Sequence, residues 1–214
     1  MQSGIPVEGQ AATQRRLLSK VQIRPHKHHA SPAICPLAGR DAKEQGKAVS
    51  YNRRVWTVHY TNEKDWGLRP IRLRARPGMM KPRGGIWASP LGCDFGWREW
   101  CKEGRLRFLK PYRVYLEVTL ERALLVNQVE DLDKLLWTPL LPGVTTISQR
   151  PDWGAMKRRG IDVVYVTEAG ERATRFSAFR DRYSGRGLYG WDCESLLILR
   201  ERAVVRWRKR RPQP

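Results

Sequence analysis

The clearest pattern in the chain is the alternation of apolar and polar side chains over residues 112–120. Successive side chains of a strand point to opposite faces of a sheet, so this alternation predicts a β-strand with one buried face. Shorter runs rich in β-branched, aromatic and aliphatic residues predict further strands. These runs cover residues 54–60, 84–89, 124–126, 161–166 and 195–199, the last extended through 204–205.

Helical spacing is limited to short segments. In 96–103, Trp97, Trp100 and Cys101 recur at i, i+3 and i+4, so they share one face of a short helix that packs on the core. Residues 129–136 carry apolar side chains at helical spacing, and 152–160 form a basic helical turn that ends at a glycine. Many strands and few short helices predict an α+β domain with a split, mostly antiparallel β-sheet.

The pattern also divides the chain. Residues 1–52 mix basic, polar and proline residues without a sustained period, which predicts a flexible basic N-terminal arm. The folded domain is expected over 53–205, and 206–214 is expected to form a basic C-terminal tail.

Charge narrows the choice of partner. The chain has 41 Lys plus Arg against 21 Asp plus Glu, a formal net charge of +20. A charge this far from zero favours a polyanionic partner, and DNA or RNA is the commonest one, although an anionic surface would select the same composition. No run of about 18 apolar residues is present, so a membrane span is not expected. A cytoplasmic protein is expected, in the host cytoplasm if the source is viral.

The cysteines predict no metal site. Cys35, Cys93, Cys101 and Cys193 are scattered without a Cys-x-x-Cys pair, so free thiols in a reducing compartment are expected. A cluster of three histidines precedes Cys35, but it lies in the arm, where nothing supplies rigid ligand geometry. The histidines are therefore interpreted as part of a solvated tail.

Three short pieces place polar or aromatic groups at strand ends. His59-Tyr60-Thr61 ends the first predicted strand, and a glycine pair opens the second, in which Trp87 and Ser89 share one face. The glycines permit a turn or a close backbone approach that a Cβ would obstruct. Asp192 and Glu194 directly precede the last strand.

This ordered pattern resembles the diphtheria-toxin-like branch of the ADP-ribosyltransferase fold, over roughly residues 53–205. In that branch a His-Gly-Thr/Ser motif, a Gly-Ile-Tyr-Phe motif and a strand-head Glu surround NAD. The present chain departs from the first motif, because Tyr60 stands in place of the glycine. The resemblance implies that NAD is a substrate, bound by His59, Tyr60, Thr61, Gly85, Trp87 and Ser89.

The resemblance also implies a catalytic acid. Cleavage of the bond between nicotinamide and ribose passes through an oxocarbenium-like state, which a nearby carboxylate stabilises. Glu194 matches the family position, but Asp192 lies two residues earlier and would point to the same side of an extended segment, so both remain candidates. Each group also has a structural interpretation: a strand-end histidine, a core tryptophan, or an acid paired with arginine.

The acceptor is expected to be a nucleic acid or a protein associated with one. In the resembled family the loop before the acid-bearing strand contacts the acceptor, and here that region is rich in glycine and arginine. Phosphate contacts are therefore expected from this loop and from the tail, through Arg180, Arg182, Arg186, Arg208, Lys209, Arg210 and Arg211.

A second function class fits the composition equally well. It is a non-enzymatic basic protein that binds nucleic acid or assembles into a nucleoprotein particle, with the arm and the tail as phosphate contacts. The small size, the many tryptophans and the scattered arginines also resemble uncharacterised proteins of tailed bacteriophages. Convergence of His59, Trp87 and Glu194 on one cleft would favour the enzyme.

Overall fold

The computed structural model describes residues 54–74, 79–141, 149–179 and 185–213, which all belong to one compact unit spanning 48–214. The arm predicted over 1–52 lies outside these residues. The principal strands are β1 (Arg54–Thr61), β4 (Ile86–Pro90), β5 (Tyr112–Thr119), β6 (Ala123–Val126), β9 (Val163–Val166), β10 (Ser195–Ile198) and β11 (Val204–Arg208). Two short pairs accompany them: β2 (Leu73–Arg74) with β3 (Arg83–Gly84), and β7 (Trp137–Pro139) with β8 (Gln149–Pro151).

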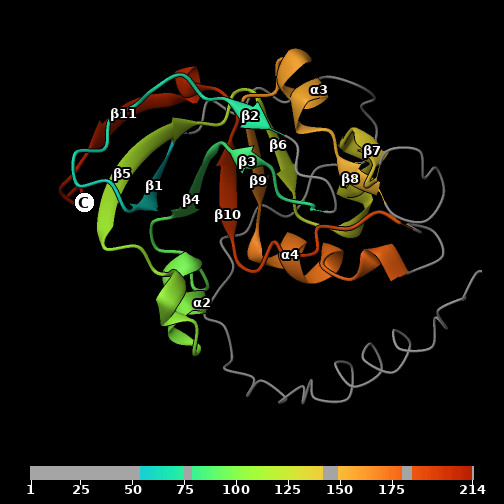
Figure 1. Cartoon of the computed structure of the whole chain (residues 1–214), viewed down its shortest axis with the longest axis horizontal. Coiled ribbons are helices and arrows are strands. Elements are labelled where there is room, and N and C mark those ends of the chain that lie inside the picture. Colours follow the sequence, from blue (N-terminus) through green and yellow to red (C-terminus); the bar gives the residue numbers. More distant parts are fainter. Residues whose placement is uncertain (1–53, 75–78, 142–148, 180–184, 214) are drawn as a thin grey trace, which may run out of the picture. The chain divides into compact units, whose positions relative to one another are not determined.

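Seven described strands form one sheet in the order β11-β5-β1-β4-β10-β9-β6 (Figure 1). Neighbouring strands are antiparallel except β6 and β9, which are parallel. The ladder between β1 and β4 is short, because only Thr57 pairs with Pro90 and Val58 with Ser89. The predicted α+β class with a mostly antiparallel sheet is confirmed.

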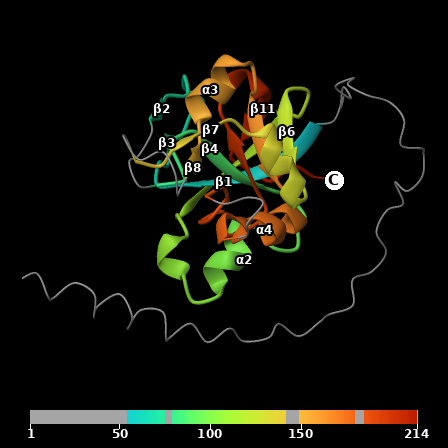
Figure 2. The same cartoon turned by 90° about the vertical axis from the view of Figure 1, so that its right-hand side faces the viewer.

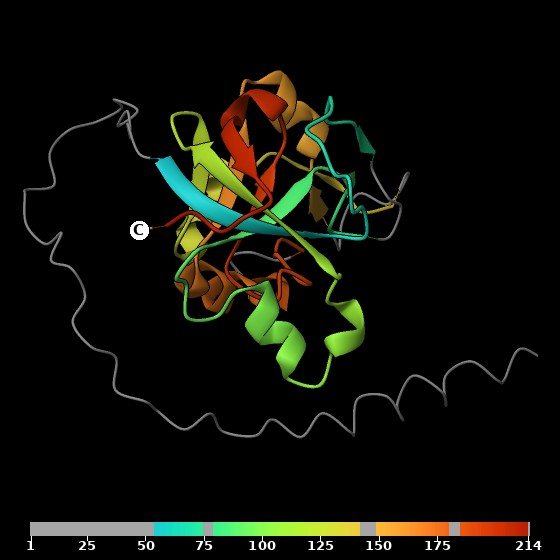
Figure 3. The same cartoon turned by 90° about the vertical axis from the view of Figure 1, so that its left-hand side faces the viewer.

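The helices are short, as predicted. They are α2 (Trp97–Lys102), α3 (Trp153–Arg158) and α4 (Glu168–Thr174), with 3₁₀ turns η1 (Leu106–Phe108), η2 (Val129–Lys134), η3 (Ser177–Phe179) and η5 (Glu201–Ala203). Helices α3 and α4 lie at opposite ends of the half of the sheet that contains β6 (Figures 1 and 2). Figure 3 shows the side formed by β1, in cyan, with α2 below it in green. No helix of the described segments is long and apolar enough to cross a membrane.

Strand β10 is buried on both faces. Leu196 and Ile198 pack into one apolar cluster with Leu116 and Val118 of β5, while Leu197 packs into a second cluster on the other face. These three apolar side chains of β10 are fully buried, and each such burial contributes roughly 1.5–3 kcal/mol. Because β10 also pairs with β4 on one edge and β9 on the other, its position is fixed from four sides.

Two segments differ from the sequence predictions. Residues 129–134 form the 3₁₀ turn η2, in which the buried carboxylate of Asp131 accepts hydrogen bonds from the amides of Asn127 and Gln128. The expected extension of the last strand through Val204 and Val205 is instead a separate strand, β11. The turn η5 separates it from β10, and β11 pairs with β5 at the far edge of the sheet.

The glycine pair behaves as predicted. Gly84 and Gly85 both have positive φ, at 87° and 75°. A Cβ on Gly84 would lie 2.0 Å from the carbonyl oxygen of Arg72, because β3 pairs closely with β2 there. A Cβ on Gly85 would lie 2.5 Å from Cδ1 of Leu197 in β10.

Gly84→Ala should therefore lower the free energy of unfolding by roughly 3 kcal/mol, because it adds a backbone clash to the strain of a positive φ. Gly92→Ala is the matched control, since Gly92 has a φ of 83° and no atom within 4 Å of the added Cβ. The control should lose only about 1 kcal/mol. Urea denaturation measures both, and equal losses would contradict the close approach of β2 and β3.

Candidate functional site

A cavity of about 300 Å³ opens where the ends of β1, β4 and β10 meet. The pairing of β4 with β1 and with β10 brings these ends together, although they lie far apart in sequence. We call it the Trp87 cavity. Its lining residues are Val58, His59, Tyr60, Lys81, Trp87, Ala88, Ser89, Trp97, Phe108, Lys110, Asp192, Cys193 and Ser195.

Most of the residues predicted to bind NAD line this cavity. His59, Tyr60, Trp87 and Ser89 do so, together with the acid Asp192. The others lie elsewhere: Thr61 Oγ1 accepts a hydrogen bond of 3.1 Å from the amide of Glu63, Gly85 packs against Leu197, and Glu194 contacts Tyr165.

The ring of Trp87 is held by a second tryptophan and by a cation. Its centroid lies 4.7 Å from that of Trp191 at an interplanar angle of 61°, and Trp191 is only 2% exposed. The ammonium of Lys81 lies 5.1 Å from the Trp87 ring centroid. An edge contact of this kind fixes the ring orientation while Trp87 still lines the cavity.

The hydrogen bond of His59 defines its tautomer. Nδ1 lies 2.7 Å from the carbonyl oxygen of Trp87, and a carbonyl can only accept, so Nδ1 carries the proton. Burial lowers the pKa of His59 below 6.5, against the opposing effect of the Trp87 hydrogen bond. At neutral pH the ring is therefore uncharged and Nε2 is a hydrogen-bond acceptor.

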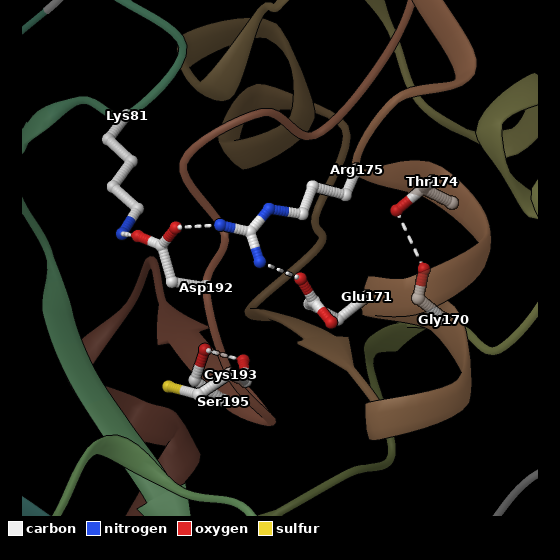
Figure 4. Close-up of polar contacts among 8 residues, drawn as sticks. All are labelled: Lys81, Gly170, Glu171, Thr174, Arg175, Asp192, Cys193 and Ser195. Carbon is white, nitrogen blue, oxygen red and sulfur yellow. Dashed lines mark hydrogen bonds and ion pairs between the residues drawn. The ribbon is translucent and has the colours of Figure 1, made fainter. Parts of the chain in front are cut away.

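Asp192 belongs to a chain of charged groups, which Figure 4 shows together. Its Oδ1 lies 3.1 Å from Nη2 of Arg175, and its Oδ2 lies 3.7 Å from Nζ of Lys81. Arg175 in turn contacts Glu171 at 3.2 Å. Burial lowers the pKa of Lys81, while Asp192 raises it, and burial raises the pKa of Glu171. The side chain of Asp192 remains 19% exposed, on the cavity side of this chain.

Helix α4 positions Arg175. Thr167 caps the helix by accepting a hydrogen bond of 3.1 Å from the amide of Gly170. Gly170 lies directly against β6, because a Cβ there would be 2.0 Å from the carbonyl oxygen of Val126. This contact brings the end of α4, and with it Arg175, to Asp192.

The two candidate acids point into different surroundings. Strand β10 begins only at Ser195 and the backbone bends at Cys193 and Glu194, so the alternation expected for a strand does not apply to residues 192–194. The carboxylate of Glu194 accepts a hydrogen bond from the Tyr165 hydroxyl, and its amide donates to Phe95 O at 3.0 Å. Burial raises the pKa of Glu194. Of the two acids, Asp192 lines the Trp87 cavity.

Sequence reasoning missed several cavity residues. Lys81 belongs to the basic segment 68–81, for which the sequence permits two interpretations: contacts from its arginines to the pyrophosphate of NAD, or a solvated loop. Arg175, which contacts Asp192 but does not line the cavity, has no motif of its own. Cys193 also lines the cavity, but burial raises its pKa to about 12, so it is a thiol and not a nucleophile at neutral pH. Ser195 donates a hydrogen bond of 3.1 Å to the Cys193 carbonyl.

The residues predicted to contact phosphate have different surroundings. Arg186 contacts Asp133 at 3.6 Å, Arg208 lies in β11 with its guanidinium 4.5 Å from the Trp56 ring centroid, and Lys209 bonds to Asp65 at 3.1 Å. Arg210 and Arg211 are exposed. Arg180 and Arg182 lie outside the described residues. Within the described segments, no group of three or more His, Cys, Asp or Glu could hold a metal ion.

The lowered pKa of His59 predicts a pH dependence of stability. Below about pH 6.5 the unfolded chain binds a proton that the folded chain resists, so the free energy of unfolding should decrease as pH falls. His59→Gln lacks this proton uptake, so its urea midpoint should decrease less than that of the wild type between about pH 7.5 and pH 5. The comparison cancels the other titrating groups. Parallel curves for the two proteins would show that His59 titrates freely.

Comparisons with known proteins do not identify a family for the chain. Neither the protein-family models, nor the curated proteins, nor the solved structures give a match to the chain.

Proposed function

We propose that the protein is an NAD-dependent ADP-ribosyltransferase that modifies a nucleic acid or a protein associated with one. The observation that carries the proposal is the Trp87 cavity, which gathers His59, Trp87 and Asp192 from three separate strand ends. These three ends are the ones that resemble the NAD-binding motifs of the diphtheria-toxin-like enzymes.

The cavity suits the nicotinamide and ribose end of NAD in size and lining. Its volume of about 300 Å³ is at the lower end of small-molecule sites, which span roughly 300–1,000 Å³. The Trp87 ring offers a flat apolar surface for the nicotinamide, and Nε2 of His59 offers an acceptor for a ribose hydroxyl. The rest of the dinucleotide would extend out of the cavity.

The reaction requires few protein groups. The bond between the nicotinamide nitrogen and C1 of the ribose breaks, and its electron pair leaves with nicotinamide. A lone pair on the acceptor forms the new bond to C1, and the acceptor proton passes to solvent. A carboxylate stabilises the positive charge that develops between these events, and we assign this role to Asp192. Its ion pairs with Arg175 and Lys81 hold it in place.

Two observations favour the non-enzymatic alternative. Glu194, the acid that matches the family position, does not line the Trp87 cavity, and Asp192, which does, is paired with Arg175 and Lys81. The same two cations offset much of the negative charge of Asp192, which reduces its ability to stabilise an oxocarbenium-like state. In that case the ion pairs would be structural, and the +20 charge of the chain would serve nucleic-acid binding alone. Absence of NAD binding by the intact protein would select this alternative.

Asp192→Asn should reduce NAD hydrolysis or transfer by at least roughly 100-fold, because it removes the charge at the developing cation, while NAD affinity changes little. The assay uses NAD labelled in the adenosine part, with DNA, RNA and protein acceptors, and calorimetry measures binding. Glu194→Gln should keep most of the activity, since Glu194 lies off the cavity.

Asp133→Asn is the matched control, because it also breaks an Asp–Arg contact, at 3.6 Å to Arg186, away from the cavity. It should react at the wild-type rate. Full activity of Asp192→Asn, or loss of activity in Glu194→Gln alone, would contradict the assignment of the acid.

A further inference from the structure

A depression of about 230 Å³ adjoins the Trp87 cavity, and we call this depression the first basic hollow. The two spaces share four lining residues, Val58, Tyr60, Ser89 and Trp97. The full lining of the hollow is Val58, Tyr60, Ser89, Pro90, Leu91, Gly92, Cys93, Gly96, Trp97, Arg98, Glu99, Arg113, Tyr115 and Arg211.

Three uncompensated guanidinium groups line this hollow. Arg98 comes from α2, Arg113 from β5, and Arg211 from the C-terminal segment. None of them forms an ion pair with another residue in the part of the chain that the structure describes, whereas Glu99 already contacts Lys102 at 3.8 Å. The hollow therefore carries net positive charge that no neighbour neutralises.

Aromatic rings lie beside these charges. The guanidinium of Arg113 lies 5.9 Å from the Tyr60 ring centroid. Burial raises the pKa of Tyr60, and Arg113 and Arg98 both oppose this shift, so both cations act on the Tyr60 hydroxyl. Tyr115 and Trp97 complete the aromatic part of the lining.

Another depression, of about 480 Å³, is also lined by basic residues, and we call it the second basic hollow. It shares Arg113, Tyr115 and Arg211 with the first. Its two acids are already paired, Glu63 with Arg69 at 3.4 Å and Asp65 with Lys209 at 3.1 Å. Lys64 adds one further cation that forms no ion pair in the described segments, so the positive charge continues from the first hollow into the second.

We propose that the two basic hollows bind the phosphates of a single-stranded nucleic acid whose end reaches the Trp87 cavity, and that this strand is the acceptor. A track with several unpaired arginines favours a polyanion over a single phosphate. Tyr60 and Trp97 in the first hollow and the exposed Tyr112 in the second suit unstacked bases, which a duplex does not present. The role as acceptor rests on the proposed function, whereas strand binding itself requires no NAD.

The test compares two triple variants of the full chain with equal loss of charge. The first triple variant removes the unpaired charges of the first basic hollow by the substitutions Arg98→Gln, Arg113→Gln and Arg211→Gln. The control combines Arg122→Gln, Arg158→Gln and Arg159→Gln, which are exposed and line neither hollow. Fluorescence anisotropy of a labelled single-stranded oligonucleotide, without NAD, measures affinity against salt, and thermal unfolding checks that both variants fold.

The first triple should bind roughly tenfold more weakly than wild type, and its slope of log affinity against log salt should fall by about 2, at about 0.7 per phosphate contact. The control should lose less than half of this. Equal losses in the two triples, or tighter binding of duplex than of single strand, would overturn the proposal.

A separate measurement distinguishes a nucleic-acid phosphate from the pyrophosphate of NAD. NAD affinity of the first triple should equal that of the wild type, because the hollow holds the acceptor. Loss of NAD affinity with oligonucleotide binding intact would assign the hollow to the dinucleotide and overturn the strand proposal. Because the oligonucleotide assay contains no NAD, failure of strand binding leaves the proposed reaction to be judged by its own assay.

Discussion

The burial of β10 on both faces is the constraint on which the rest of the structure depends. Leu196 and Ile198 fill one apolar cluster and Leu197 fills the other, so the strand cannot shift register without exposing one of them. Its two edges pair with β4 and β9. Residues just before Ser195 are consequently fixed in space, and these include Asp192.

The Trp87 cavity follows from this constraint together with the short ladder between β1 and β4. Strand β4 places Trp87 between His59 on one side and Leu197 of β10 on the other. Helix α4 adds a charge from outside the sheet, since its close contact with β6 brings Arg175 to Asp192. A neutral histidine, a fixed aromatic ring and a constrained acid thus meet in one place, and a basic track adjoins them.

The sequence predicted what depends on local pattern. The alternation of apolar and polar residues predicted β1 and β5. The glycine pair predicted a close backbone approach, which Gly84 makes to the carbonyl oxygen of Arg72. It could not separate Asp192 from Glu194, because the answer depends on where β10 begins, and that is set by tertiary pairing. Long-range contacts were also out of reach: no local pattern indicates that Arg175 meets Asp192. The same holds for β11, which leaves β10 for the opposite edge of the sheet.

The central claim is that the Trp87 cavity holds the nicotinamide end of NAD. A crystal structure of the protein with NAD, or with an analogue that resists cleavage, tests it most directly. The account predicts the nicotinamide ring against Trp87 and a ribose hydroxyl within hydrogen-bond distance of His59 Nε2 and the Asp192 carboxylate. NAD bound elsewhere, or a cavity that stays without ligand at saturating NAD, would contradict it.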